Sequence, residues 1–243
     1  MDFKNWFYPE SGIGGFSDVD GTIIFFNRVN SLLKPDFVVL DFGCGRAEYK
    51  KDPSEYRRNL RIIKGKVKKV IGLDVDSAAK KNPFLNEFHL LKGTQWPIDD
   101  KKIDVIICDW VLEHLTNVEN FFSESNRVLK KGGYLCIRTP NKWGYVAIGA
   151  RLIPNKHHSF VTSFVQRKRQ RKDVFPTVYS CNSVHELKKV MKKYGFESVV
   201  YEYDAEPSYF AFSRIFYFFG VLYHRFAPSI LKGTIFAFGK KVN

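Results

Sequence analysis

Residues 38–45 form an apolar stretch that ends in Asp41 and in two closely spaced glycines, Gly43 and Gly45. This pattern is typical of a buried parallel strand that turns into a helix around a nucleotide-like ligand, because glycines let the backbone turn sharply and approach the ligand. The spacing argues against phosphate binding. A dinucleotide fingerprint needs a glycine where Glu48 stands, and the Gly-Lys-Ser/Thr end of a P-loop does not occur here. An acid before the first glycine instead suits a ligand that carries an ammonium group.

The stretch resembles the first motif of the class I S-adenosylmethionine-dependent methyltransferases, Asp-x-Gly-x-Gly-x-Gly, with Ala47 in place of the last glycine. Other motifs of that family follow in the same order. They are a second strand that ends in an acid (70–76), a Trp-Pro approach to the fourth strand and the strand itself (95–98 and 103–109), a Leu-Glu-His signature (111–115), and the turn before the fifth strand (127–134). Together they cover roughly residues 36–141.

The resemblance implies S-adenosylmethionine as the cofactor and S-adenosylhomocysteine as its product. Asp41 is expected near the methionyl ammonium group. Asp74, at the end of the second strand, is expected to accept two hydrogen bonds from the ribose hydroxyls. Asp76 is the alternative ribose ligand if the strand register is shifted by two residues.

The expected cofactor contacts all lie at the carboxyl ends of predicted strands or in the turns that follow them. They are Asp41, Gly43, Cys44, Gly45, Asp74, Val75, Gln95, Trp96, Asp109 and Trp110. Gln95 and backbone groups are expected to hold the adenine, because no acid precedes the Trp-Pro pair. Asp109 and Trp110 are expected to border the methyl-bearing sulfonium.

His114 of the Leu-Glu-His signature is the candidate general base, because it follows the fourth strand closely and imidazole titrates near neutral pH. It could accept a proton from a hydroxyl or carboxyl nucleophile. The alternative is that His114 caps or packs the following helix, and both interpretations stay open. Methyl transfer requires little from the protein, since the sulfonium is already activated and alignment can supply most of the acceleration.

Alternating apolar strands and amphipathic helices predict an α/β fold, a Rossmann-like doubly wound, mostly parallel seven-stranded sheet with helices on both faces. Predicted strands lie at 37–41, 70–73, 88–91, 103–108 and 134–138, and predicted helices at 22–33, 119–129 and after a capping box at 182–186. The resemblance implies that 198–203 and 233–238 form an antiparallel C-terminal edge hairpin. The chain, 1–243, is interpreted as a single methyltransferase domain, with a cofactor-binding core at about 20–141 and a substrate cap with edge strands at about 142–243.

The chain contains 39 Lys and Arg against 25 Asp and Glu, and this net charge of +14 favours anionic partners. Basic residues gather in an insertion at 50–69 and in a run at 167–172, although a solvated charged face is the alternative. The segment 209–223 is nearly all apolar and aromatic. It suits either a buried cap or dimer contact or an in-plane helix at a membrane surface. We therefore expect an anionic or lipid-linked substrate and consider an anionic membrane surface as a partner.

Nucleic acid is a less favoured partner, because residues 109–112 do not match the Asn/Asp-Pro-Pro-aromatic tetrapeptide of base N-methyltransferases. The four cysteines show no CxxC spacing, which indicates a reducing cytoplasm and no metal site. No apolar stretch reaches the roughly 18 residues of a spanning helix, and no signal-peptide pattern occurs. We expect a cytoplasmic location, peripheral at the inner face of the membrane if 209–223 contacts lipid.

The favoured activity is O-methylation of a small-molecule, sugar or lipid-linked glycan acceptor. Residues 138–141 and 173–177 resemble bacterial methyltransferases associated with surface polysaccharides, and this favours a sugar or glycolipid hydroxyl. An RNA-directed methyltransferase and a non-catalytic S-adenosylmethionine-binding subunit are the alternatives. The sequence does not indicate the oligomeric state.

Overall fold

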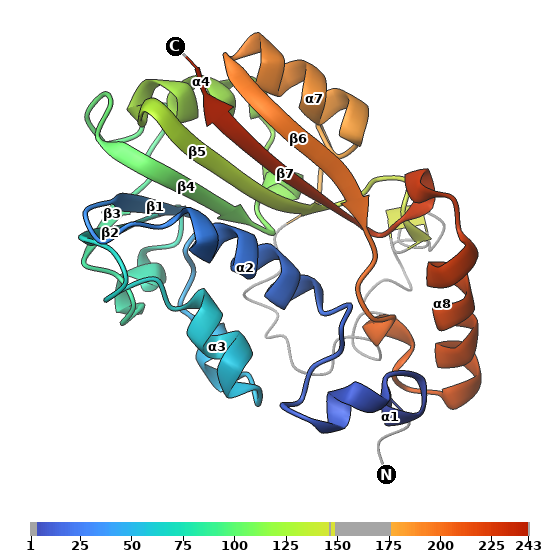
Figure 1. The fold of residues 1–243 in the computed structure, drawn as a ribbon. Coiled ribbons are helices and arrows are strands. Elements are labelled where there is room, and N and C mark those ends of the chain that lie inside the picture. The colour runs from blue at the N-terminus through green and yellow to red at the C-terminus, as the bar shows by residue number, and fades with distance from the viewer. Residues whose placement is uncertain (1–3, 146, 149–175, 243) are drawn as a thin grey trace.

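The computed structural model of the chain describes residues 4–145, 147–148 and 176–242 (Figure 1). A seven-stranded sheet with the order β3-β2-β1-β4-β5-β7-β6 forms its centre. The strands are β1 (Val38–Phe42), β2 (Lys69–Asp74), β3 (Glu87–Leu90), β4 (Ile103–Asp109), β5 (Leu129–Pro140), β6 (Phe196–Tyr203) and β7 (Thr234–Lys241). The first five are parallel, whereas β7 runs antiparallel to both β5 and β6. The predicted fold class and the antiparallel edge hairpin are confirmed.

Helices cover both faces of the sheet, as predicted. In the view of Figure 1, α2 (Gly21–Leu32) and α3 (Glu55–Arg61) lie below the sheet, and α4 (Val118–Val128) and α7 (Val184–Lys193) lie above it. Two further helices, α1 (Lys4–Phe7) and α8 (Arg214–Phe226), lie beside each other away from the sheet. Single turns of 3-10 helix complete the chain: η1 (Pro9–Gly12), η2 (Glu48–Lys51), η3 (Ser77–Lys81), η4 (Leu112–His114), η6 (Ser208–Phe210) and η7 (Ser229–Leu231).

Side-chain caps explain where the helices begin. The carboxylate of Asp20 accepts hydrogen bonds from the backbone N–H groups of Thr22 and Ile23, at 2.9 and 3.0 Å, and so starts α2. Ser183 starts α7 with the predicted capping box: its Oγ donates to Glu186 and accepts from the Glu186 N–H. The insertion at 50–69 folds into α3 and short turns beside α2.

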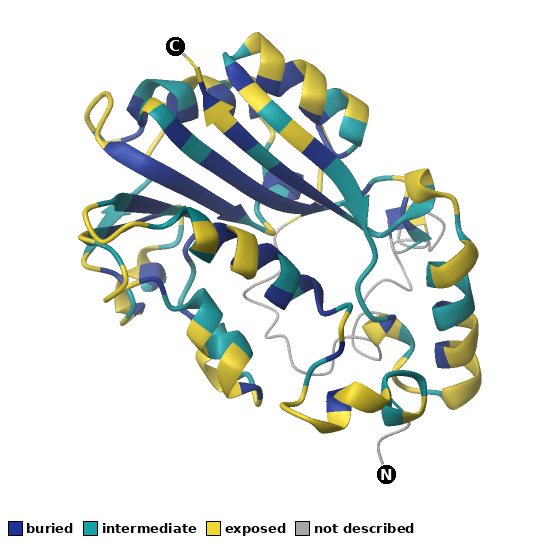
Figure 2. Cartoon of the chain, viewed as in Figure 1, coloured by how far each residue is buried: buried dark blue, intermediate teal, exposed yellow. Residues whose placement is uncertain are grey.

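The central strands are buried on both sides because each sheet face packs against helices, whereas the edge strands β3 and β6 are more exposed (Figure 2). One apolar cluster joins α4 and α7 to the sheet and includes Leu40, Ile106 and Phe122. The other joins α2 to the opposite face and includes Phe25 and Phe236. All four cysteines are buried and free.

The apolar segment 209–223 forms parts of η6 and α8. Across the described ranges 4–145, 147–148 and 176–242, every helix is too short or too polar to cross a bilayer. The predicted basic run 167–172, and 173–175 of the polysaccharide-associated motif, lie outside the described residues.

Candidate functional site

The parallel strands end at one edge of the sheet, and the strand order reverses between β1 and β4. A crevice for a ligand is expected at such a switch point. The turn after β1 enters it through Gly43 and Gly45, whose φ angles of +71° and +51° are left-handed and favour glycine. A Cβ on Gly43 would lie 2.3 Å from Cγ2 of Val111, whereas a Cβ on Gly45 would meet no atom within 4 Å. The backbone at Gly45 is therefore open to a ligand.

Asp74 holds this glycine turn in place. Its Oδ2 accepts a hydrogen bond from the Gly45 N–H at 2.9 Å, and its Oδ1 accepts one from the Asp76 N–H at 2.8 Å. Asp74 is the last residue of β2, while Asp76 lies beyond it and caps η3 through the Ala78 N–H. The observed register thus favours Asp74 over Asp76 as the acid at the strand end. Val75, the next predicted contact, exposes its side chain.

Three carboxylates converge at the crevice: Asp41 near the end of β1, Asp74 at the end of β2, and Asp109 at the end of β4. Burial, and after it the Asp109 carboxylate, raise the pKa of Asp41 to about 7, although the guanidinium of Arg61 acts in the opposite direction. A cation beside Asp41 would stabilise its ionised form and lower this raised pKa. Cys44 lies behind the turn, and burial raises the pKa of its thiol, so it behaves as a packing group.

Asp109 is held by Arg138 of β5. Nε and Nη2 of Arg138 donate to Oδ1 and Oδ2 of Asp109 at 2.6 and 2.8 Å, and the Arg138 side chain is only 3% exposed. The guanidinium also donates to Oγ1 of Thr22 and lies over the ring of Trp110 at 5.3 Å. Trp110 follows β4 with a left-handed φ of +59°, and its N–H donates to the Arg138 carbonyl. The predicted pair Asp109 and Trp110 is thus fixed by one arginine.

Arg61 is a site residue that the sequence analysis missed. It ends α3, in the insertion that was interpreted only as a basic cluster. Its Nη2 lies 3.4 Å from Oδ2 of Asp109, its guanidinium lies over the ring of Tyr49 at 4.5 Å, and its Nε is buried without a hydrogen-bond partner. Nothing in the sequence distinguishes Arg61 from the basic residues around it, because only the fold of the insertion turns it inward.

Gln95 and Trp96 occupy different environments. Gln95 is exposed on the loop before β4. Trp96 is 2% exposed, stacks on Phe42 with ring centroids 4.8 Å apart, and donates its backbone N–H to Glu124. The ring of Trp96 therefore belongs to the apolar core, and the expected cofactor contact at this residue stays a prediction.

His114 lies in η4, directly after β4. Its Nδ1 is 2.9 Å from the carbonyl oxygen of Pro176, so in the neutral ring Nδ1 carries the proton and Nε2 carries the lone pair. Nε2 is 3.8 Å from Oε1 of Glu113, whose buried carboxylate also accepts a hydrogen bond from Thr139. The ring therefore has one basic nitrogen and also anchors the chain at Pro176, and the role of general base stays a prediction.

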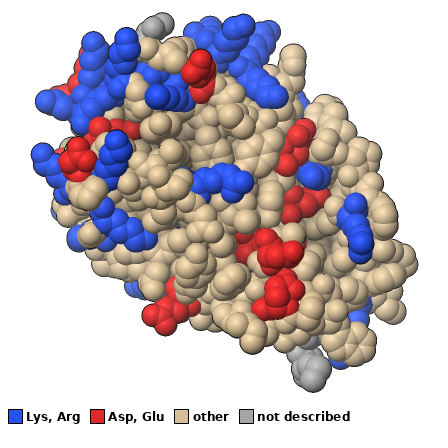
Figure 3. All heavy atoms as spheres, viewed as in Figure 1, with Lys and Arg blue, Asp and Glu red and all other residues tan. Residues whose placement is uncertain are grey.

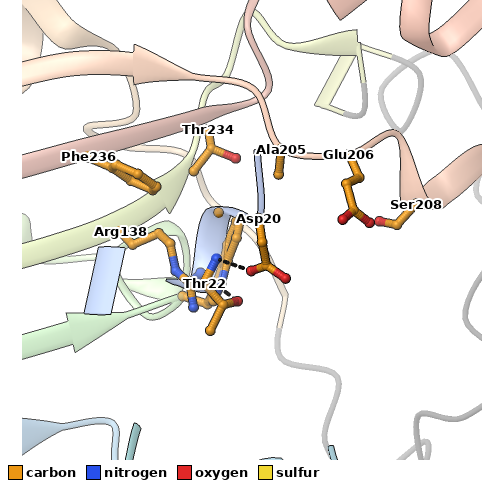
Figure 4. Close-up of a pocket in the computed structure, with 10 residues that line it drawn as sticks. Asp20, Thr22, Arg138, Ala205, Glu206, Ser208, Thr234 and Phe236 are labelled. Carbon is orange, nitrogen blue, oxygen red and sulfur yellow. Dashed lines mark hydrogen bonds between the residues drawn. The ribbon is translucent and has the colours of Figure 1, made fainter. Parts of the chain in front are cut away.

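A pocket of about 220 Å³ adjoins the crevice across Trp110 and Arg138 (Figure 4). Its polar lining comes from the start of α2, from β7 and from the segment after β6, namely Asp20, Thr22, Glu206, Ser208 and Thr234. The rings of Trp110 and Phe236 supply apolar wall. None of the polar residues belongs to a recognisable motif, and only the strand order brings them together.

Two acids, Asp20 and Glu206, line the pocket beside one cation, Arg138. Asp20 pairs with Arg57 at 2.6 Å, and Glu206 pairs with Lys4 at 2.8 Å. On the face seen in Figure 3, acidic side chains gather where Figure 1 draws the start of α2 and the segment after β6. Basic side chains gather instead towards α7 and the left edge.

The family model described as a methyltransferase domain matches residues 24–201, which is more than half of the chain. The chain belongs to the class I S-adenosylmethionine-dependent methyltransferases. S-adenosylmethionine is therefore its cofactor, and the crevice fits it: the turn leaves open space at Gly45, Asp41 favours a cation, and Nε of Arg61 lacks a partner.

Two curated proteins are similar over part of this methyltransferase. A probable S-adenosylmethionine-dependent methyltransferase of Mycolicibacterium smegmatis is 33% identical over 108 residues, 43% of this chain and 38% of its own length. A ubiquinone biosynthesis O-methyltransferase of Pelagibacter ubique is 33% identical over 142 residues, 52% of this chain and 54% of its own length. The matches thus span about half or less of these relatives.

Solved structures share the fold of the methyltransferase at low identity. Geranyl diphosphate C-methyltransferase from Streptomyces coelicolor, crystallised with Mg²⁺, geranyl diphosphate and S-adenosylhomocysteine, has a TM-score of 0.54 at 14% identity, over 90% of this chain and 77% of that chain. A chain of the complex between the Haloferax volcanii Trm112 methyltransferase activator and a putative methyltransferase has a TM-score of 0.56 at 16% identity, over 100% of this chain and 96% of that chain.

Replacing Asp74 with alanine should weaken binding of S-adenosylhomocysteine roughly ten- to a hundredfold, because hydrogen bonds to a charged acceptor contribute about 1.5–3 kcal/mol. Titration calorimetry measures the affinity, and the melting temperature without ligand reports the fold. Asp76→Ala is the matched control and should change the affinity by less than about threefold. The reverse pattern would identify Asp76 as the ribose ligand.

Proposed function

We propose that this methyltransferase transfers the methyl group of S-adenosylmethionine to a hydroxyl oxygen of a sugar or a similar polyhydroxylated acceptor, free or linked to a lipid. The observation that carries the proposal is the pocket beside Trp110 and Arg138. Carboxylates accept hydrogen bonds and hydroxyls both donate and accept them, so Asp20, Glu206, Ser208 and similar groups suit an acceptor that is itself rich in hydroxyls. The aromatic walls suit the apolar face of a ring.

The charges of the pocket restrict which part of an anionic acceptor could enter it. Asp20 and Glu206 line the pocket, and each is already paired with one cation. A phosphate or carboxylate placed there would lie beside these two carboxylates, and Arg138, the cation in the pocket lining, is already bound to Asp109. We therefore propose that the neutral, hydroxyl-bearing part of the acceptor binds in the pocket and that any phosphate lies outside it.

Different residues of the crevice are proposed to bind different parts of the cofactor. Asp74 is proposed for the ribose hydroxyls, with Gly43 and Gly45 giving the backbone close approach. Asp41 is proposed for the ammonium group, because a raised carboxyl pKa falls when a cation lies beside it. Arg61 is proposed for the cofactor carboxylate, because a guanidinium with an unpaired buried N–H binds a carboxylate well.

His114 is proposed as the group that accepts the hydroxyl proton. The bound cofactor would supply an activated methyl group on its sulfonium sulfur. The acceptor oxygen would bond to the methyl carbon as the bond between that carbon and the sulfur breaks. The displaced proton needs a base, and Nε2 of His114 carries a lone pair when Nδ1 donates to Pro176. Glu113, 3.8 Å away, would stabilise the resulting imidazolium.

Two alternatives have weaker support. An RNA-directed methyltransferase would need an electropositive approach to the acceptor pocket, whereas Asp20 and Glu206 lie there. A non-catalytic S-adenosylmethionine-binding subunit would not need a pocket that adjoins the crevice at Trp110. The similar ubiquinone biosynthesis protein is named as an O-methyltransferase, which favours oxygen as the acceptor atom.

The affinity for S-adenosylhomocysteine should depend on pH through Asp41. In the ligand-free protein a pKa of about 7 leaves Asp41 mostly protonated in mildly acidic solution, so the folded state loses stability as pH rises from about 4 to about 7. A bound ammonium group favours the carboxylate, so binding below pH 7 must release a proton. The affinity should rise up to tenfold per pH unit towards pH 7 and fall above about 8, where the ligand amine becomes neutral.

Calorimetry in two buffers of different ionisation enthalpy would measure the released proton directly. Asp41→Asn should remove the acidic limb, and 5′-methylthioadenosine, which lacks the amine, should bind independently of pH. Proton uptake, or no proton exchange, in the wild-type protein would contradict the role of Asp41.

Arg61→Gln should weaken S-adenosylhomocysteine roughly ten- to a hundredfold, because a charge-assisted hydrogen bond to the carboxylate is lost. Its affinity for 5′-methylthioadenosine, which has no carboxylate, should stay the same in titration calorimetry. Lys68→Gln, an exposed cation of the same insertion, is the control and should affect neither ligand. Equal weakening of both ligands would mean that Arg61 supports the fold of the crevice and does not bind the carboxylate.

The acceptor class can be tested with cofactor that is labelled in its methyl group. Incubation with fractionated extract should label a sugar or lipid-linked glycan fraction, and the label should resist alkali because a methyl ether, unlike a methyl ester, is not hydrolysed. Glu206→Gln should raise the KM for that fraction and leave the affinity for S-adenosylhomocysteine unchanged. Label in RNA would support the nucleic-acid alternative, and cofactor binding without any labelled product would support the non-catalytic alternative.

A further inference from the structure

Helix α8 is apolar around most of its circumference, and among the described residues one side of it packs on the rest of the chain. On that side Tyr217 contacts the ring of Phe7, with centroids 5.4 Å apart. At Gly220 the helix approaches so closely that a Cβ would lie 2.7 Å from atoms of Pro207 and Phe210. These contacts determine which side of α8 faces outward.

The outward side is an apolar stripe. At 3.6 residues per turn, Ile215, Phe218, Phe219, Leu222 and Phe226 fall within an arc of about 100°. The side chains of Ile215, Phe219 and Phe226 are 69%, 60% and 74% exposed, and Figure 2 shows exposed positions along the same helix.

Neighbouring segments extend this stripe. Trp6 of α1, Phe212 before α8 and Ile230 of η7 are also exposed, and Arg214 of α8 lies over the Trp6 ring at 5.0 Å. We call the surface formed by Trp6, Phe212, Ile215, Phe218, Phe219, Phe226 and Ile230 the α8 face. A group of exposed apolar side chains of this kind is typical of an interaction site.

The exposed charged residues of α8 are cations, while Asp204 lies 3.9 Å from His224 of the same helix. After Glu206 the chain contains no Asp or Glu, and its charged residues are Arg214, Arg225, Lys232, Lys240 and Lys241. Arg214 and Arg225 are both exposed and are eleven positions apart, so they lie on the same flank of the stripe, about three turns from each other. An apolar stripe with cations along one flank is the pattern of a helix that lies in the surface of an anionic bilayer.

The basic insertion at 50–69 lies apart from the α8 face. Most of its cations make contacts within the fold: Arg57 binds Asp52 and Asp20, and Lys69 binds Glu87. Lys64 and Lys66 donate to backbone carbonyls, and Arg61 turns into the crevice. Figure 1 also draws α3 and α8 on different sides of the molecule.

A second copy of the chain fits the α8 face less well. A twofold interface pairs the same patch on both subunits. It would bring Arg214 and Arg225 of both copies to one interface, and the segment that follows Glu206 offers no acid to pair with them. Anionic lipid headgroups supply the missing negative charge, and acyl chains accept the aromatic side chains.

We propose that the α8 face docks this methyltransferase on an anionic lipid surface, with α8 lying in the plane of the bilayer. At 13 residues the helix is about 20 Å long, which is less than the roughly 30 Å of a hydrocarbon core, so it lies in the surface and does not cross it. The docking stands independently of the proposed acceptor.

If the acceptor is lipid-linked, which rests on the proposed function, the docking also orients the pocket. Glu206 and Ser208 line the pocket, and the chain continues from them through η6 to Phe212 and α8. The pocket and the α8 face therefore meet at this short connection, so a headgroup could enter the pocket while its acyl chain stays in the bilayer.

The test is sedimentation of the full chain with vesicles of phosphatidylcholine, alone or with about a third phosphatidylglycerol, at low and high salt. The wild-type protein should bind the anionic vesicles more tightly, and salt should weaken this binding. The double variant Arg214→Gln/Arg225→Gln should bind them about ten- to thirtyfold more weakly, since each cation near the surface contributes about 1 kcal/mol. The pair Lys50→Gln/Lys68→Gln in the insertion should change binding by less than about threefold.

The apolar contribution is tested with Ile215→Ser/Phe219→Ser, which should lower the affinity for both vesicle types more than tenfold. Val199→Ser, an equally exposed apolar residue on β6, is the matched control and should have no effect. Unchanged melting temperature and unchanged affinity for S-adenosylhomocysteine would verify that the variants are folded and that the cofactor site is intact.

Three results would overturn the docking: no sedimentation with either vesicle type, binding that only the insertion variants weaken, or a dimer in light scattering that Ile215→Ser/Phe219→Ser converts to monomer. The last result would identify the α8 face as a contact between two copies. Each of these leaves the proposed methylation to be judged by the labelling experiment alone.

Discussion

The ion pair between Asp109 and Arg138 joins the two halves of the site. Asp109 ends β4, which borders the switch point, and Arg138 belongs to β5, the next strand of the sheet. Because the pair is buried, either partner alone would leave an uncompensated charge, at a cost of several kcal/mol. The same guanidinium bonds Thr22 and packs on Trp110, so a single side chain fixes the acid of the crevice, the start of α2 and the wall of the pocket.

The positions of the charged residues say more about the function of this protein than its net charge does. The net charge of +14 suggests an enzyme that is basic all over, but the insertion at 50–69 uses most of its cations for internal pairs and carbonyls. Two acids and Arg138 line the pocket, whereas the cations of α8 border an apolar surface. The proposed anionic surface and the proposed neutral, hydroxyl-rich acceptor would then be recognised by different parts of one small chain.

The sequence predicts those parts of the fold that local patterns determine. The positions of the parallel strands, the α7 capping box and the glycine turn follow from apolar periodicity and from residue types that the backbone requires, as at Gly43. The pocket could not be predicted, because Asp20, Glu206 and Thr234 are far apart in sequence and meet only through β7. The side-chain directions of Arg61 and Trp96 could not be predicted either. Arg61 is one basic residue of a cluster and turns into the crevice, whereas Trp96 belongs to a motif and turns into the core.

The backbone of Trp110 has a consequence for how this enzyme can change over evolution. A bulky residue with a φ of +59° stores about 1–2 kcal/mol of conformational strain, and it does so where crevice and pocket meet. The surrounding contacts with Arg138 maintain that strain. Glycine at this position would relieve it and stabilise the free protein, but would remove the ring that separates the two compartments. Selection for stability and selection for activity are therefore opposed at this residue.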